Sequence, residues 1–252
     1  SMTNEKRVKL ISEVEELRTL SGVINRTRRR DIDNIVIRKP ETIEVSFTPE
    51  QSLIHDEMLK IQRRILEQTS GNISINFLMS TIRRQAASCI FGLLPLMKDI
   101  LNRRLDEVLW DELFEFIPDV DAIQDIKAEI SALLKLASQV SGNDPKLDAL
   151  LQVLKGKQAL TNNKVMVFSS FIHTLKYLNT HLLDAGIRVG FIFGEVDDEE
   201  RLELRRRFQL SKEDPDSLDV MLFSEVGCEG LDYQFCDTMV NYDIPWNPMR
   251  IE

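Results

Sequence analysis

The sequence predicts an α/β fold in its second part, a parallel sheet with helices on both faces, preceded by a mainly helical region. Three observations predict this. After Gly142, short runs of consecutive apolar residues alternate with segments that have the apolar spacing of a helix. Apolar runs without alternation are typical of parallel strands, which are buried on both faces. Before Gly142, most apolar residues instead recur at the spacing of one helix face.

The first part of the chain is predicted to contain a linker over residues 1–48 and a helical protrusion over residues 49–142. Within the linker, residues 8–17 carry an apolar stripe at helical spacing. After the break at Pro40, residues 42–47 alternate between apolar and polar side chains, as a β-strand does.

The protrusion is predicted to begin with a helix at Thr48. Thr48 is suited to the N-cap, Pro49 to the first helical position, and Gln51 to a reciprocal hydrogen bond with the cap. Its predicted apolar face consists of Leu53, Ile54, Met58, Ile61 and Ile65. Further amphipathic stretches cover residues 75–94, 96–116 and 122–140, separated by Pro95 and Pro118 and ended by Gly142.

Residues 143–252 are predicted to form the sheet and its covering helices. Asp144 and Pro145 begin a helix, and Gly186 ends the next one. A third helix has acids at its start, residues 197–200, and arginines at its end, residues 205–207, which matches the helix dipole. The apolar runs that predict strands are residues 165–168, 187–193, 219–223 and 238–242.

Composition excludes several classes of protein. The hydrophobic fraction of 43% and charged fraction of 29% are those of a globular protein, neither fibrous nor disordered. No apolar run approaches the roughly 20 residues of a membrane span, and the polar start lacks the core of a secretory signal. We therefore expect a cytoplasmic protein with no membrane partner.

Metal chemistry is not indicated by the cysteines and histidines. The three cysteines, Cys89, Cys228 and Cys236, are odd in number and form no C-x-x-C pair, which argues against a disulfide framework or a structural zinc site. The three histidines are scattered. We expect no metal ligands within this chain.

Charge gives a mixed signal. A formal net charge of −9 argues against a protein that simply coats nucleic acid. Local basic clusters are nevertheless present, and each one alone is more often a solvated helix face than a binding site. The clusters lie at residues 26–30, 63–64, 83–84, 103–104 and 205–207.

In an open parallel sheet, ligands bind at the carboxyl ends of the strands. The loop Ser224–Asp232 is the most informative of those predicted here, because glycines flank small and acidic residues directly after a buried strand. Such a loop permits close approach of its backbone to a phosphate. As a bare pattern, the same loop is more often only a turn.

Several motifs in sequence order resemble a known family. Residues 164–169 (K-V-M-V-F-S) resemble motif IV of superfamily-two helicases, and residues 224–232 resemble motif V. Residues 242–248 (Y-D-I-P-W-N-P) resemble the Swi/Snf-type subset, especially the bacterial branch that includes the RNA-polymerase-associated ATPase. Residues 28–51 resemble the linker between the two lobes of that family. The resemblance implies that residues 143–252 are a second RecA-like lobe, incomplete because the chain ends before motif VI. It also implies a bacterial or archaeal source rather than a nuclear one.

The resemblance implies roles for individual residues. Nucleic-acid backbone would be contacted by Ser169, Ser170, Gly194, Arg201 and Ser224. The ribose and phosphates of ATP would be approached by Gly230 and Asp232. An alternative for Arg201 is a solvated arginine paired with a neighbouring acid, and for Asp232 a loop cap. Hydroxyls and backbone amides can hold phosphates without reading base sequence.

The resemblance also implies what the chain does not supply. The sequence has no G-x-x-x-x-G-K-[ST] loop and no acidic pair at a strand end to hold Mg²⁺, so ATP and Mg²⁺ would depend on a first lobe. No catalytic residue is expected in residues 1–252, and we expect the chain alone to lack ATP hydrolysis. Motif V departs from many remodelling relatives at Cys228–Gly230 and Asp232, which leaves open duplex translocation or strand separation.

The sequence-based hypothesis is therefore an ATP-binding, DNA-binding hydrolase, a helicase-like translocase in its full-length form. Expected partners are double-stranded DNA, the first RecA-like lobe, and RNA polymerase or another nucleoprotein complex. One alternative is a helical protein-interaction module supported by a Rossmann-like sheet. Another is a self-contained Rossmann-like enzyme, which is disfavoured because no glycine motif follows the first predicted strand, at Ser169–Phe171.

Overall fold

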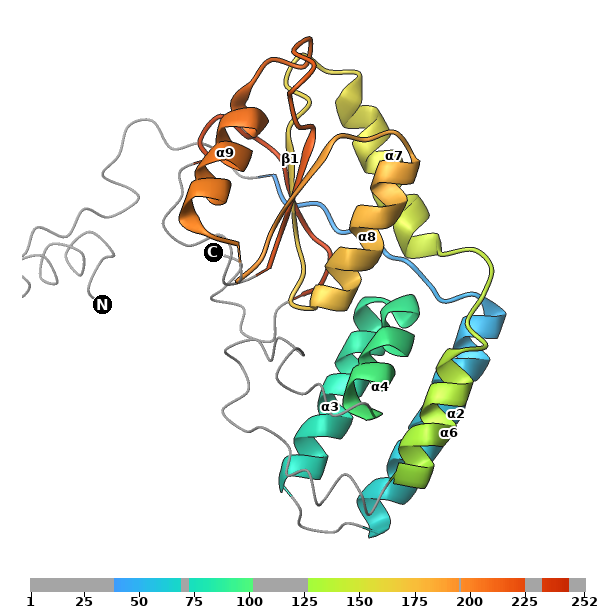
Figure 1. Cartoon of the computed structure of the whole chain (residues 1–252). Helices are drawn as coiled ribbons and strands as arrows, with labels where there is room; N and C mark the ends of the chain where they lie inside the picture. The colour runs from blue at the N-terminus through green and yellow to red at the C-terminus, as the bar shows by residue number, and fades with distance from the viewer. Residues whose placement is uncertain (1–38, 69–72, 102–126, 195, 225–232, 245–252) are drawn as a thin grey trace, which may run out of the picture. The chain divides into compact units, whose positions relative to one another are not determined.

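The computed structural model describes residues 39–68, 73–101, 127–194, 196–224 and 233–244 (Figure 1). The chain divides into two compact units, residues 1–43 and 44–252. All elements described below belong to the second unit. The predicted helix at residues 8–17, the basic clusters at residues 26–30 and 103–104, and Pro118 lie outside the described residues.

The helical region forms a core of its own. Its buried residues come from four helices and include Met58, Ile65, Ile82, Met97 and Leu133. The elements are α2 (Pro49–Gln68), α3 (Ile73–Ser88), the short 3₁₀ helix η2 (Ile90–Gly92), α4 (Leu93–Leu101) and α6 (Lys127–Ala137).

The start of α2 confirms the predicted capping box. The Gln51 backbone N–H donates to Thr48 Oγ1 at 3.2 Å, and the Thr48 N–H donates to Gln51 Oε1 at 3.0 Å. Met58, Ile61 and Ile65 are buried as predicted, but Leu53 is 68% exposed. Successive helix positions differ by about 100°, so Leu53 lies about 120° around the helix from Ile65 and outside the buried stripe.

Two predicted features of this region are wrong. Residues 42–47 form no strand, because no described strand pairs with them, and Ile43, Val45 and Phe47 stay exposed. Pro95 does not separate two helices. The chain breaks at Cys89 and η2 instead, and Pro95 lies in the first turn of α4, where a backbone N–H has no helical acceptor to lose.

The sheet has four parallel strands in the order β2-β3-β1-β4. Val165 pairs with Val220, and Val189 pairs with Val220 from the other side, so β3 and β1 are central. The predicted parallel sheet is therefore confirmed. The strands are β1 (Val165–Phe168), β2 (Val189–Ile192), β3 (Val220–Phe223) and β4 (Met239–Asn241).

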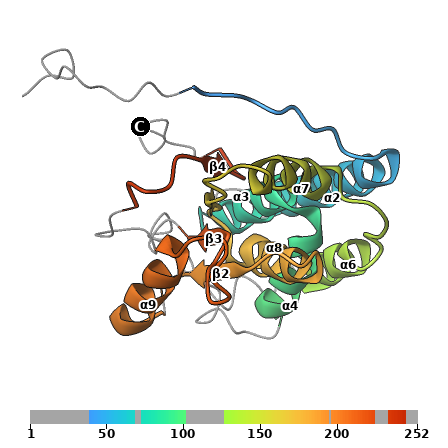
Figure 2. The same cartoon turned by 90° about the horizontal axis from the view of Figure 1, so that it is seen from above.

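Helices cover both faces of this sheet, as predicted (Figures 1 and 2). On one face, α7 (Pro145–Gln158) and α8 (Ile172–Asp184) bury leucines against Val165, Val167 and Leu222. On the other face, α9 (Asp198–Gln209) buries Phe208 in a core with Met166, Met221 and Phe223. Alternate residues of one strand thus enter different cores, which explains why its apolar run is continuous.

The ends of these helices follow the local signals. Asp144 accepts a hydrogen bond from the Lys146 N–H at 3.0 Å at the start of α7, and Asp197 accepts from the Glu200 N–H at 2.8 Å at the start of α9. Gly186 follows α8 with φ of 77°, a left-handed conformation that favours glycine. The predicted domain boundary near residue 142 stays a prediction. None of the helices in the described ranges combines the length and apolar character needed to cross a membrane.

Candidate nucleic-acid interface

The carboxyl ends of the four parallel strands lie along one edge of the sheet. Gly194 follows β2, Ser224 follows β3, Ser169 follows β1 and Asp243 follows β4. Four residues predicted from sequence, Ser169, Ser170, Gly194 and Ser224, are therefore brought to the same edge. We call this the carboxyl edge.

Asp243 links the two loops that follow β1 and β4. Its Oδ2 accepts hydrogen bonds from the Ser169 hydroxyl and from the Ser170 backbone N–H, the latter at 3.1 Å. Ser169 Oγ also accepts from the Phe171 N–H at 3.2 Å, at the start of α8. The sequence placed Asp243 in the loop after the fourth predicted strand but assigned it no role, because its bond to Ser169 joins distant parts of the chain.

Lys146 is a second residue of the carboxyl edge that sequence reasoning missed. Its ammonium lies 3.7 Å from Asp243 Oδ1 and 4.3 Å from the centroid of the Tyr242 ring. It also donates to the carbonyl of Ser88 at 2.8 Å, at the end of α3. Lys146 follows the Asp144–Pro145 pair that begins α7. The sequence therefore indicated only a position in the first turn of a helix, and nothing in it indicated the contact with Asp243.

Several buried polar atoms of the carboxyl edge have no hydrogen-bond partner among the described residues. They are Ser224 Oγ, Asp243 Oδ1 and Tyr242 Oη. The backbone of Ser224 is satisfied, because its N–H donates to the Ile192 carbonyl at 3.1 Å. A buried polar group without a partner destabilises a fold by about 1–3 kcal/mol.

Arg201 lies beside the Gly194 loop and contacts its carbonyls. Its Nε donates to the Val196 carbonyl at 2.8 Å, and Nη2 lies 3.4 Å from the carbonyls of Phe193 and Gly194. No carboxylate of the described residues pairs with it, and its predicted phosphate contact stays a prediction. A side chain at Gly194 would meet nothing within 4 Å, which leaves open space against this loop.

The sheet and its covering helices lie in a part of the chain that is similar to a known protein family. Residues 145–252 match the family model described as the helicase conserved C-terminal domain. This part of the chain is a helicase C-terminal domain. It is the second lobe of a superfamily-two helicase-like protein, as the motifs at Lys164 and Ser224 predicted.

Similar proteins match this chain over different shares of its length. The chain is 28% identical to the uncharacterized ATP-dependent helicase YqhH of Bacillus subtilis, over 98% of this chain and 40% of that protein. It is 31% identical to the ATP-dependent RNA helicase dbp10 of Schizosaccharomyces pombe, over 42% of this chain and 12% of that protein. The chain thus spans less than half the length of these relatives.

A solved structure supports the fold of the helicase C-terminal domain. The helicase domain of Pyrococcus furiosus Hef matches with a TM-score of 0.52 and 17% sequence identity, over 100% of this chain and 58% of that chain. At this identity the likeness concerns the fold alone. It confirms the RecA-like sheet preceded by a helical region.

The predicted nucleotide-binding residues Gly230 and Asp232 lie outside the described residues and stay predictions. The described residue that leads into their loop is Ser224, whose buried hydroxyl lacks a partner there. A hydroxyl in this position fits a phosphate oxygen as acceptor. Within the described ranges, no group of three or more His, Cys, Asp or Glu side chains is arranged to hold a metal ion.

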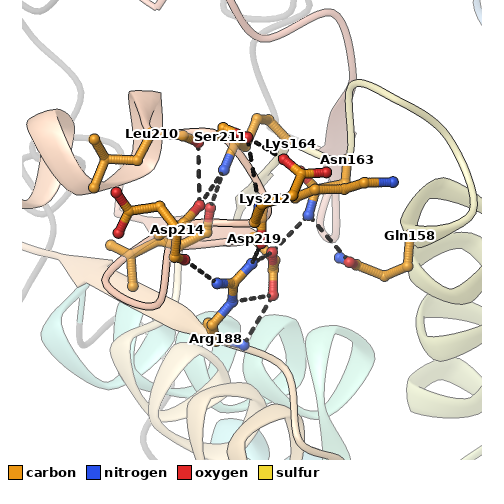
Figure 3. Close-up of polar contacts among 12 residues, drawn as sticks. Gln158, Asn163, Lys164, Arg188, Leu210, Ser211, Lys212, Asp214 and Asp219 are labelled. Carbon is orange, nitrogen blue, oxygen red and sulfur yellow. Dashed lines mark hydrogen bonds and ion pairs between the residues drawn. The ribbon is translucent and has the colours of Figure 1, made fainter.

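The opposite edge of the helicase C-terminal domain carries a larger charged cluster (Figure 3). Asp219, directly before β3, accepts from Arg188 Nη2 at 2.6 Å, Arg188 Nε at 3.0 Å and Asn163 Nδ2 at 2.6 Å. Arg188 also donates to the carbonyls of Asp214 and Lys212, at 2.7 and 3.0 Å. We call this cluster the amino-edge network.

The polar groups of the amino-edge network bond mainly to one another. Lys164 Nζ donates to Ser217 Oγ and to the Leu218 carbonyl, both at 2.7 Å. Burial raises the pKa of the Asp219 carboxyl, but the hydrogen bonds and charge of Arg188 outweigh burial and hold that pKa below its usual value. Only Gln158 Nε2 lacks a partner among the described atoms of this network. These contacts hold the loop after α9 in place rather than await a ligand.

Proposed function

We propose that this chain is the second motor lobe of an ATP-dependent translocase of the Swi/Snf type that moves along double-stranded DNA. In this proposal the carboxyl edge holds the phosphate backbone through Ser169, Ser170, Gly194, Arg201 and Ser224. Gly230 and Asp232 approach the nucleotide from the same edge. A first RecA-like lobe and RNA polymerase or another nucleoprotein complex are the proposed partners.

One observation carries the proposal: the row of polar groups along the carboxyl edge has unfilled hydrogen-bonding capacity. Ser224 Oγ is buried and has no described partner, while Gly194 leaves its loop open to a ligand. Hydroxyls, backbone groups and an arginine hold phosphates without contacting bases, as a motor that moves along any sequence requires.

The choice of the Swi/Snf type and of duplex DNA rests on residues 242–248, which resemble that subset. Similarity to the B. subtilis protein named an ATP-dependent helicase covers nearly the whole chain, which supports including the helical region in the motor. Other relatives are named RNA helicases, so single-stranded RNA is the competing ligand that an experiment must test.

In this proposal, Asp243 and Arg201 hold the loops that contact the phosphate backbone. Asp243 orients the Ser169 hydroxyl and the Ser170 backbone, so that the loop after β1 keeps one shape. The Arg201 guanidinium closes the Gly194 loop through its carbonyls while Nη1 has no acceptor in the described part of the protein. ATP with Mg²⁺, when bound with a first lobe, supplies the free energy that moves the lobes relative to the DNA.

Fluorescence anisotropy with a labelled DNA duplex of mixed sequence tests the proposal. Affinity should fall steeply as salt rises, because each neutralised phosphate releases counterions. Arg201→Ala should reduce the log–log salt slope by about 0.9, which corresponds to roughly eightfold weaker binding at ~0.1 M salt. The matched control is Arg206→Ala on the same helix, whose guanidinium is already paired with Glu203 at 2.7 Å.

Each outcome of this experiment has a meaning. Absence of duplex binding by the wild-type chain, or equal effects of the two arginine variants, contradicts the proposed backbone contact. Preference for single-stranded RNA over duplex contradicts the DNA assignment while leaving the lobe assignment intact. A release assay for inorganic phosphate, with ATP, Mg²⁺ and duplex present, should detect no turnover by the chain alone, since residues 1–252 contain no G-x-x-x-x-G-K-[ST] loop.

A further inference from the structure

The last turn of α3 is fixed to the first turn of α8 by buried hydrogen bonds. Gln85 Nε2 donates to Thr174 Oγ1 at 3.0 Å, and the hydroxyls of Ser88 and Thr174 lie 2.8 Å apart. All three side chains are buried. Because α8 begins just after Ser169 and Ser170, this contact holds one end of the helical region beside the carboxyl edge.

Two charged groups add to the same attachment. Lys146 donates to the Ser88 carbonyl at 2.8 Å, where α3 ends and its carbonyls lack helical donors. On the next helix along, Asp99 Oδ2 lies 3.1 Å from His173 Nε2 of α8. The end of α3 therefore has a defined position relative to the loop after β1, and so do the side chains that it carries.

Arg84 is carried by this fixed turn. Its guanidinium carbon lies 5.4 Å from the centroid of the Phe171 ring, and Phe171 directly follows Ser169 and Ser170. In the described part of the chain, Arg84 has no hydrogen bond and no carboxylate partner. Other arginines of the helical region differ, since Arg83 donates to Gln62 at 3.3 Å and Arg63 pairs with Glu67 at 2.9 Å.

A cation held over an aromatic ring keeps hydrogen-bonding capacity, because the ring face takes up no strong N–H donor. Since the Arg84 guanidinium lies over the Phe171 ring and makes no hydrogen bond among the described residues, its N–H groups remain able to donate to oxygen acceptors. Phosphate is the acceptor whose geometry and charge best match that planar fork. Contact with the ring already restricts the Arg84 side chain, so less conformational entropy is lost when it binds a phosphate.

We propose that Arg84 contacts a phosphate of the DNA held by Ser169 and Ser170, so that the helical region contributes a backbone contact of its own. The inference rests on the proposed function, because that function places DNA at the loop after β1. It assigns to α3 a direct part in binding, beyond support of the sheet.

Salt-dependent binding of the labelled duplex tests this inference with Arg84→Ala and Arg64→Ala in the full 252-residue chain. Arg64 is an exposed arginine of α2 and provides the same change of charge away from the loop. Arg84→Ala should lower the log–log salt slope by about 0.9 and weaken binding about eightfold at ~0.1 M salt. Arg64→Ala should leave the slope at its wild-type value.

A third variant separates phosphate binding from structural support. Arg84→Lys retains the charge but not the planar fork, so it should recover most of the salt slope and part of the affinity. Urea unfolding of each variant shows whether the change acts through stability. Equal slopes for Arg84→Ala and wild type, or equal losses in Arg84→Ala and Arg64→Ala, overturn the inference. Failure of the wild-type chain to bind duplex overturns the proposed function first.

Discussion

The two edges of this sheet differ in how completely their polar groups are satisfied. At the amino edge, the Asp219 carboxylate accepts from Arg188 and Asn163, and Lys164 is bonded to Ser217 and Leu218. At the carboxyl edge, fewer charges are present, but Ser224 Oγ, Asp243 Oδ1 and Tyr242 Oη are buried without a hydrogen-bond partner among the described residues, and Asp243 Oδ1 has only the Lys146 ammonium at 3.7 Å.

Contacts within the protein are enough to account for a dense charged cluster, so such a cluster needs no ligand to explain it. The amino-edge network has the higher concentration of ionisable groups, yet nearly every donor meets an acceptor within the protein. Buried polar groups without a partner among the described residues are the better candidates for ligand contacts, because a ligand that bonds to them recovers the free energy lost on their burial. Substitutions at the two edges should therefore differ, with the amino edge affecting the free energy of unfolding and the carboxyl edge affecting duplex affinity.

The largest effect is expected from Asp219→Ala in the amino-edge network. Removal of the carboxylate leaves Arg188 and Asn163 without their shared acceptor, and the free energy of unfolding should fall by about 3 kcal/mol. Urea denaturation measures this change. Affinity of the folded fraction for duplex DNA should stay at the wild-type level, and a specific loss of affinity would place a ligand at the wrong edge.

Ser224→Ala should have the opposite character. The variant removes a buried hydroxyl without a described partner, so the free energy of unfolding should rise by about 1 kcal/mol. Duplex affinity should fall by roughly five- to tenfold, the value of one hydrogen bond to a charged acceptor. Ser131→Ala, which removes an exposed hydroxyl bonded to the Lys127 carbonyl, is the control. Reduced stability with unchanged affinity would make Ser224 purely structural.

A smaller effect is expected from Lys146→Ala. The loss of one partly exposed positive charge beside Asp243 should weaken duplex binding about threefold, in line with a partly screened surface charge. Lys155→Ala on the same helix α7 changes the same charge at an exposed position about two and a half turns away, and its affinity should match wild type. Equal losses in both variants would mean that only overall charge matters.

The smallest effect concerns the pH dependence of stability at the amino edge. Because the pKa of Asp219 is lowered in the folded protein, its stabilising contribution is present above the unfolded pKa of about 3.9. It is lost as the pH falls through the lower folded pKa. The difference in unfolding free energy between wild type and Asp219→Asn should therefore shrink below about pH 4. A difference that stays constant with pH would refute the ion pair as its source.

Features set by neighbouring residues were predictable from the sequence. The capping box at Thr48, the cap at Asp144 and the stop at Gly186 each depend on a few consecutive residues. Strands β1, β2 and β3 were predictable because each of their apolar runs serves two cores, whereas β4 contributes only Val240 to one core and leaves Met239 exposed. Their parallel arrangement then followed from the helices between them.

Features set by distant residues were not predictable. Asp243 bonds to Ser169 across 74 positions of sequence, and Lys146 reaches Ser88 across 58. Neither contact leaves a local pattern. The predicted strand at residues 42–47 failed for a related reason, because alternation describes a chain that could pair but does not supply a partner strand. Arg201 was predicted at the edge, but its carbonyl contacts depend on the path of the Gly194 loop.

The position of Lys146 has a mechanical consequence. One ammonium group joins the final carbonyls of α3 to the ring of Tyr242 and the carboxylate of Asp243. A rotation of the helical region about the sheet must therefore either carry Tyr242 and Asp243 with it or make Lys146 release one set of contacts. If α3 moves away from the sheet, Lys146 can keep its contact with α3 or its contacts with Tyr242 and Asp243, but not both.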